Sequence, residues 1–80
     1  MIEKCKELYR EVLGKEHTDN GFYLKGSHHV GGLGIVIELR YAPNTFKDEH
    51  VSEVLFHKDG NIYQKGRKRK TIGTHQLKFN

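Results

Sequence analysis

The chain has 80 residues, of which 35% are hydrophobic and 30% charged, and its formal net charge is +4. A chain of this length buries only about 60–65% of the surface that its unfolded form exposes, so one thin core is the most it supports. The composition is that of a globular protein, and the eight aromatic side chains (four Tyr, four Phe) argue against disorder. We therefore expect a single domain, residues 1–80, and no second one.

Cysteine content and hydropathy bear on location. Cys5 is the only cysteine, so the chain closes no internal disulfide. The first residues lack the apolar stretch of a secretory signal, and no apolar run approaches the length of a membrane span. We expect a soluble, cytoplasmic protein that does not enter a membrane.

The first predicted element is an amphipathic helix over residues 2–15. Apolar residues recur there at spacings of three and four, with charged residues between them, as a helix with one buried face requires. The turn residues 18–21 end this element. The apolar stripe comprises Ile2, Cys5, Leu8, Tyr9, Val12 and Leu13.

After residue 21 the apolar period changes from 3.6 to 2, which indicates strands. The strongest alternation runs over 33–41, and Pro43-Asn44 is expected to end that strand. The other predicted strands are 22–24, 51–57, 62–64 after a hairpin turn at 58–61, and 71–79. One helix on an antiparallel meander of four to five strands is an α+β fold.

Positive charge is concentrated in the last third of the chain. Residues 1–56 hold 7 Lys/Arg and 9 Asp/Glu, a balance of −2, whereas residues 57–80 hold 7 and 1, a balance of +6. The densest part is Lys65-Gly66-Arg67-Lys68-Arg69-Lys70, in a predicted loop between two strands. Clustered cations attract a phosphate backbone by counterion release.

This run is the candidate binding site, for nucleic acid or for a protein partner. Its predicted residues are Lys65, Arg67, Lys68, Arg69 and Lys70, with Lys78 as a further cation and Tyr63, His75 and Phe79 as planar faces for stacking on bases. With one or two of Lys58, Lys65 and Lys78, the run would neutralise about 4–6 phosphates. Two other interpretations stay open: a solvated hairpin tip that keeps an edge strand soluble, and contact with an acidic protein surface.

A second candidate is the glycine-rich segment 25–34. Its glycines leave backbone amides free for phosphate, but no lysine occupies the Walker position and no helix follows. A flexible hairpin connection is the better interpretation. Within it, Gly26-Ser27-His28-His29 resembles the catalytic segment of the HicA family of mRNA-cleaving toxins. That resemblance, over about residues 4–29, implies that His28 or His29 acts as general acid or base in RNA cleavage, although the downstream sequence departs from the family.

The other reactive side chains give no site. His28 and His29 are adjacent, and His50 and His57 lie an odd number of residues apart, so in a regular strand either pair would point to opposite faces. We predict no metal site and no cofactor. Cys5 is expected in the core, and Asp48 and Glu49 in a polar loop.

The sequence thus predicts a small basic, non-enzymatic module associated with nucleic acid, whose partner is a DNA or RNA backbone. The first alternative is a small phage or mobile-element type protein that binds and inhibits a larger nucleic-acid enzyme through an acidic surface. The second alternative is a small RNA-cleaving toxin.

Overall fold

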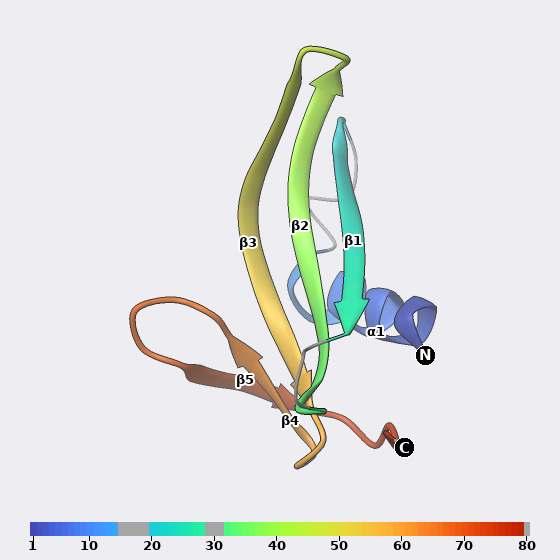
Figure 1. Ribbon diagram of the computed structural model, residues 1–80, viewed down its shortest axis with the longest axis vertical. Helices are drawn as coiled ribbons and strands as arrows, with labels where there is room; N and C mark the ends of the chain where they lie inside the picture. Colours follow the sequence, from blue (N-terminus) through green and yellow to red (C-terminus); the bar gives the residue numbers. More distant parts are fainter. Residues whose placement is uncertain (15–19, 29–31, 80) are drawn as a thin grey trace.

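The computed structural model describes residues 1–14, 20–28 and 32–79. One helix, α1 (Ile2–Tyr9), continues as a π-helical turn (η1, Arg10–Gly14) and lies against a sheet of five strands (Figure 1). The strands are β1 (Phe22–His28), β2 (Gly34–Asn44), β3 (Lys47–His57), β4 (Asn61–Gln64) and β5 (Lys70–Thr74). They pair antiparallel in the order β1-β2-β3-β4-β5. The predicted α+β meander is confirmed.

The core lies between α1 and one face of the sheet. Cys5 and Tyr9, one helical turn apart, point into it, and the Tyr9 hydroxyl is 2.7 Å from the Ser52 Oγ of β3. The sheet supplies alternate residues, as strands with one buried face do. Those of β1 to β4 are Leu24, Ile35, Ile37, Leu39, Val54, Phe56 and Ile62, and Ile72, Leu77 and Phe79 pack beside them.

Two glycines let backbone and side chains approach closely. A Cβ atom on Gly26 would lie 2.3 Å from the Cγ2 of Ile2, so glycine at this point of β1 makes room for the helix. Gly34 has φ +149°, and a Cβ there would lie 2.0 Å from the Phe56 carbonyl oxygen. Both glycines therefore have a structural reason within the sheet, whereas the sequence suggested a flexible loop over 25–34.

The prediction that Pro43-Asn44 ends a strand is wrong. β2 continues to Asn44 and β3 begins at Lys47, so the turn is Thr45-Phe46 and the two strands form a long arm that extends past β1 (Figure 1). Pro43 fits because Tyr41 pairs with Glu49 and Asn44 with Lys47, which leaves an extra residue on β2 at this bulge. Asp48 and Glu49, predicted in a loop, therefore lie on a strand.

Other boundaries also differ from the sequence prediction. The α-helix ends at Tyr9 and its last turn widens to a π-turn, while residue 15 lies outside the described residues, as do residues 18 and 19 of the predicted turn. β1 reaches His28 rather than stopping at Leu24. β5 ends at Thr74 rather than at Phe79. After it, the His75 amide still donates to the Gly60 carbonyl at 2.9 Å, and the side chains of Leu77 and Phe79 pack against the core. None of the described helices is long and apolar enough to cross a membrane.

Candidate nucleic-acid interface

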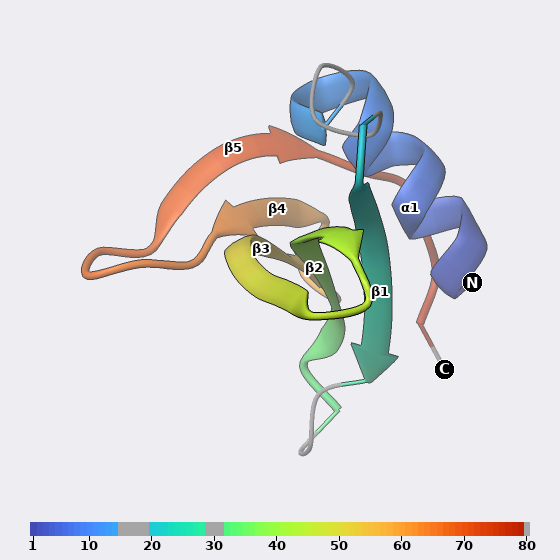
Figure 2. The same cartoon turned by 90° about the horizontal axis from the view of Figure 1, so that it is seen from above.

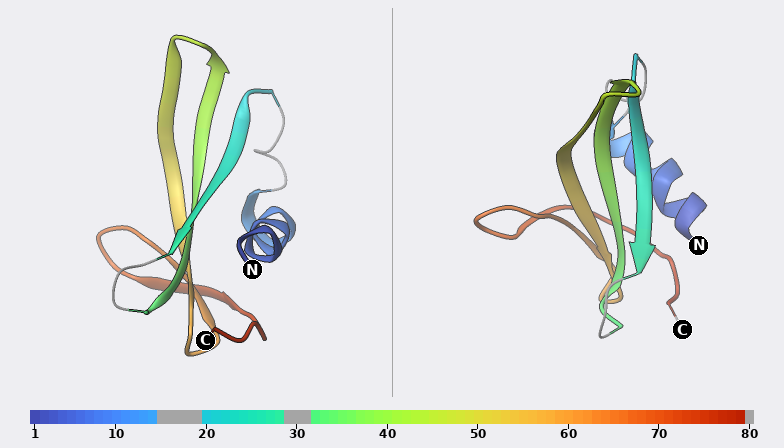
Figure 3. Two further views of the ribbon diagram at one scale, coloured as in Figure 1. Left: turned by 45° about the vertical axis from the view of Figure 1, so that its right-hand side comes forward. Right: turned by 45° about the horizontal axis from the view of Figure 1, so that its top comes forward.

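The basic run lies in the connection between β4 and β5. Gln64, the last residue of β4, pairs with Lys70, the first residue of β5, so Lys65–Arg69 connect the two strands. We call Lys65–Lys70 the β4–β5 loop, because Lys70 lies at the end of the ladder beside this connection. In three orientations this loop extends away from the helix and from the β2–β3 arm (Figures 1, 2 and 3). The side chains from Gly66 to Lys70 are all exposed. The structure therefore brings the predicted cations together on one projecting element.

The cations of this loop differ in whether a carboxylate neutralises them. The Lys65 Nζ lies 3.2 Å from the Glu53 Oε1, and the Lys65 amide donates to the Glu53 carbonyl at 3.1 Å. Among the described residues, no carboxylate forms an ion pair with any of the four cations that follow. Lys65 is thus held in place where the loop leaves β4. The four cations that follow have no carboxylate partner among the described residues, and we call them the available cations: Arg67, Lys68, Arg69 and Lys70.

Tyr63 lies beside the loop but is engaged within its own hairpin. The Arg69 guanidinium lies 5.1 Å from the centre of the Tyr63 ring. The Tyr63 hydroxyl donates to the Asp59 Oδ2 at 2.6 Å and accepts from the Asn61 amide at 3.1 Å. The hydrogen bond to Asp59 raises the pKa of Tyr63 and lowers the pKa of Asp59. Tyr63 therefore holds the turn before β4 and one arginine of the loop.

His75 does not belong to this surface. Its side chain is 9% exposed, and its ring packs 5.8 Å from Phe56 and 5.4 Å from Phe79, centre to centre. Its Nε2 donates to the His57 carbonyl at 2.6 Å, and its Nδ1 accepts from the Leu77 amide at 3.1 Å. A carbonyl only accepts and an amide only donates, so this pattern assigns the proton to Nε2. The ring is a part of the core and offers no face to a base.

Lys78 is exposed, but it follows β5 on the segment that runs to the C-terminal end, on the far side from the loop (Figures 1 and 3). Of the nine side chains predicted for the site, the structure thus groups Tyr63 with the five cations of the β4–β5 loop and separates His75, Lys78 and Phe79 from them. Phe79 packs against the core and the His75 ring.

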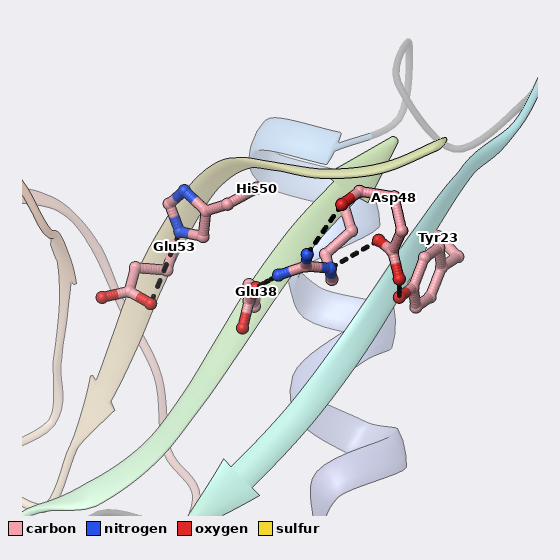
Figure 4. Close-up of polar contacts among 6 residues, drawn as sticks. Tyr23, Glu38, Asp48, His50 and Glu53 are labelled. Atoms are coloured by element: carbon pink, nitrogen blue, oxygen red, sulfur yellow. Dashed lines mark hydrogen bonds and ion pairs between the residues drawn. The ribbon is translucent and has the colours of Figure 1, made fainter. Parts of the chain in front are cut away.

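A second polar cluster lies on the sheet face opposite α1, where sequence analysis predicted no site (Figure 4). The Arg40 Nε donates to the Asp48 Oδ1 at 2.6 Å, another guanidinium nitrogen donates to the Asp48 carbonyl at 3.1 Å, and a third bonds Glu38. The Tyr23 hydroxyl donates to the Asp48 Oδ2 at 2.9 Å. The bond to Arg40, and then that to Tyr23, lowers the pKa of Asp48. The cluster links β1, β2 and β3, and its charged groups are paired with one another.

The histidine parity argument fails at a bulge. Leu39 pairs with Ser52 and Arg40 with His50, so Val51 is an extra residue on β3, and His50 and His57 share the face opposite α1. His50 there lies 3.6 Å from the Glu53 carboxylate (Figure 4). Within the described part of the chain, no three His, Cys, Asp or Glu residues are grouped as metal ligands would be.

The toxin-like segment is a strand rather than a loop. Gly26, Ser27 and His28 are the last residues of β1, and His29 lies outside the described residues. Where the described residues resume after β1, they form strands and no helix. Cys5 is buried in the core, and burial raises the pKa of its thiol to about 11. This disfavours the thiolate, which is the nucleophilic form of cysteine.

The tip of the β2–β3 arm carries an apolar side chain that sequence analysis missed. Phe46 is 97% exposed, although its backbone is fixed by a hydrogen bond from its amide to the Asn44 Oδ1 at 2.8 Å. Lys47 beside it lies 5.3 Å from the centre of the Tyr41 ring. Asn44 two residues before Phe46 is the sequence signal of such a turn.

Comparison of the chain with protein-family models, with curated proteins and with solved structures gave no match. The candidate binding features of the described residues lie at the two hairpin ends: the cationic β4–β5 loop and the arm with Phe46 at its tip.

Proposed function

We propose that this protein is a small, non-enzymatic nucleic-acid-binding module that contacts phosphates through its β4–β5 loop. One observation supports it above the others: four consecutive cations, Arg67 to Lys70, are exposed on a projecting loop and have no described carboxylate partner. Cations already paired with carboxylates release fewer counterions when they meet phosphate. The number of unpaired cations therefore matters more than the total number of cations. The free, buried Cys5 fits the reducing, cytoplasmic location that belongs to this proposal.

The geometry lowers the expected number of phosphate contacts. Lys65 is neutralised by Glu53, and Lys58 lies in the turn before β4, at the opposite end of that strand from the loop. The segment after β5, which carries Lys78, lies across the molecule from the loop (Figure 1), so four contacts remain of the 4–6 expected from sequence. The logarithm of the affinity for duplex DNA should then fall with the logarithm of salt concentration with a slope of about −3.6.

The test is a titration of the purified protein into fluorescently labelled DNA and RNA, single- and double-stranded, followed by anisotropy from about 50 to 200 mM salt. Binding to at least one of these, with the steep salt dependence above, is the expected result. Nucleic acid that co-purifies with the protein, detected by its absorbance at 260 nm and removed by high salt, would support the proposal. A flat titration against all four nucleic acids at the lowest salt would overturn the proposal.

The second candidate function is binding to a protein, such as a nucleic-acid enzyme that the module inhibits, and Phe46 is the observation that favours it. A fully exposed aromatic side chain can enter an apolar pocket on a partner, and because the turn already fixes the Phe46 backbone, binding there orders little additional backbone. Carboxylates on Asp48 and Glu49 close to this tip disfavour phosphate there.

The protein-binding candidate is tested by cross-linking and affinity capture with three proteins: wild type, Phe46→Ala, and Val51→Ala as an exposed apolar control on β3. A specific partner should be lost with Phe46→Ala and retained with Val51→Ala and with Arg67→Glu/Arg69→Glu. A partner retained by Phe46→Ala would remove the tip from this function.

A further inference from the structure

The aromatic side chains near the basic loop decide which form of nucleic acid suits it. Proteins that bind single strands combine a cationic groove with aromatic rings on which successive bases stack. A duplex keeps its bases stacked inside and presents phosphates outside, so cations alone suffice. The question is therefore whether the β4–β5 loop has rings available for bases.

The ring nearest to the loop is already engaged. Tyr63 is half-buried, the Arg69 guanidinium covers one face at 5.1 Å, and the His57 ring meets it edge-on with centres 5.6 Å apart. Its hydroxyl is held by two hydrogen bonds. Stacking of a base on the covered face would require Arg69, one of the four available cations, to leave its place.

The other rings on this side belong to the core. Phe56 is fully buried, His75 is 9% exposed, and Phe79 packs against both the core and His75. The exposed rings among the described residues are Tyr23 at 38%, Phe46 at 97% and His50, and they lie on β1 and on the β2–β3 arm. Figure 1 shows the tip of the β2–β3 arm far from the loop.

The shape of the element also suits a duplex. The loop closes a two-stranded ribbon in which Gln64 pairs with Lys70. Paired strands lie about 4.8 Å apart, and the major groove of B-DNA, about 12 Å wide, admits such a ribbon between its two rows of phosphates. The four available cations at the end of this ribbon can then reach the phosphates that border the groove.

We infer that the β4–β5 loop selects duplexes: it binds the phosphate backbone of double-stranded nucleic acid irrespective of sequence. It binds single strands more weakly, because none of the described aromatic rings beside the loop is free to stack on a base. This inference rests on the proposed function and names its ligand. The per-phosphate salt slope is about −0.9 for a duplex and about −0.7 for single strands, so four contacts predict roughly tenfold tighter duplex binding at about 50 mM salt, if both forms bind equally at 1 M.

The experiment compares a labelled DNA duplex of roughly 20 base pairs with one of its strands, for two unrelated sequences, using the wild-type protein and Tyr63→Leu. The wild type should bind both duplexes alike and roughly tenfold more tightly than either strand. Tyr63→Leu, checked for folding by circular dichroism, should change single-strand affinity by less than about twofold, whereas loss of a stacked base would lower it by about 5- to 150-fold.

Each outcome is decisive. Single-strand binding as tight as duplex binding, or a large loss with Tyr63→Leu, would overturn the duplex inference and leave the proposed function standing. No binding to either form would overturn both. If Tyr63→Leu does not fold, the ratio of duplex to single-strand affinity in the wild type still decides.

Discussion

The two hairpin ends of this sheet are both rich in charged residues, and they differ in what those charges do. On the β2–β3 arm, Arg40 is bonded to Glu38 and to Asp48, which also accepts from Tyr23. In the β4–β5 loop, four successive cations have no described carboxylate partner. The first set of charges fixes three strands together, whereas the second set has no such structural role among the described residues and is the set that we propose binds phosphate. Charge availability, rather than charge count, separates the structural end from the proposed binding end.

The largest expected effect is on the sheet that both ends share. Phe56 of β3 is fully buried in the core, so Phe56→Ala should lower the free energy of unfolding by about 3–5 kcal/mol through lost burial and a cavity. Urea denaturation measures it. A loss below about 1 kcal/mol would mean that this side chain does not hold the common scaffold of the arm and the loop.

The polar cluster on the β2–β3 arm should make stability depend on pH. Because Arg40 and Tyr23 lower the pKa of Asp48, this carboxylate adds stability above its unfolded pKa, near 3.8, that is lost as pH falls through the lower folded value. Melting temperatures measured from pH 6 down to pH 2 should therefore decline less steeply in Asp48→Asn than in the wild type. Glu11→Gln, exposed on the helical segment, is the control. Parallel curves for Asp48→Asn and wild type would contradict the role given to this cluster.

The smallest effect concerns the arm's tip. Phe46 is 97% exposed and contributes almost no burial, so Phe46→Ala should change stability by no more than about 0.5 kcal/mol. Nucleic-acid affinity should also stay the same, since the tip lies far from the loop. Reduced duplex binding by Phe46→Ala would show that the two ends act on the same ligand, and the comparison would then fail.

The sequence predicted the fold well where side-chain periodicity is strong. The helix stripe, the alternation along β2 and the turn at 58–61 all identify elements that the structure contains. The sequence-based prediction failed where the pairing of two strands overrides the preferences of the local sequence. Pro43 lies in a bulge instead of ending β2, and the extra residue Val51 reverses the facing of His50. Neither bulge has a signature in a single sequence, because each depends on the pairing of two strands.

The sequence likewise predicted one part of the candidate site and not the other. A run of adjacent cations is visible in sequence, and the structure keeps it together on one loop. Sequence spacing cannot tell which aromatic residues face the run: His75 turns into the core through hydrogen bonds to His57 and Leu77. Nor does it show that Glu53, twelve residues earlier, neutralises Lys65 across the β3–β4 pair.

We propose that the available cations of the loop, rather than the net charge of the protein, bind phosphate. Arg67→Glu/Arg69→Glu and the matched variant Lys4→Glu/Arg10→Glu, at exposed positions of the helical segment, change the net charge equally. The measurement is the salt dependence of duplex affinity for these two variants and the wild type. The loop variant should bind much more weakly, with its slope reduced from about −3.6 to about −1.8, while the helix variant keeps the wild-type slope. Equal losses in the two variants would contradict the account, because they would show that net charge alone attracts the nucleic acid.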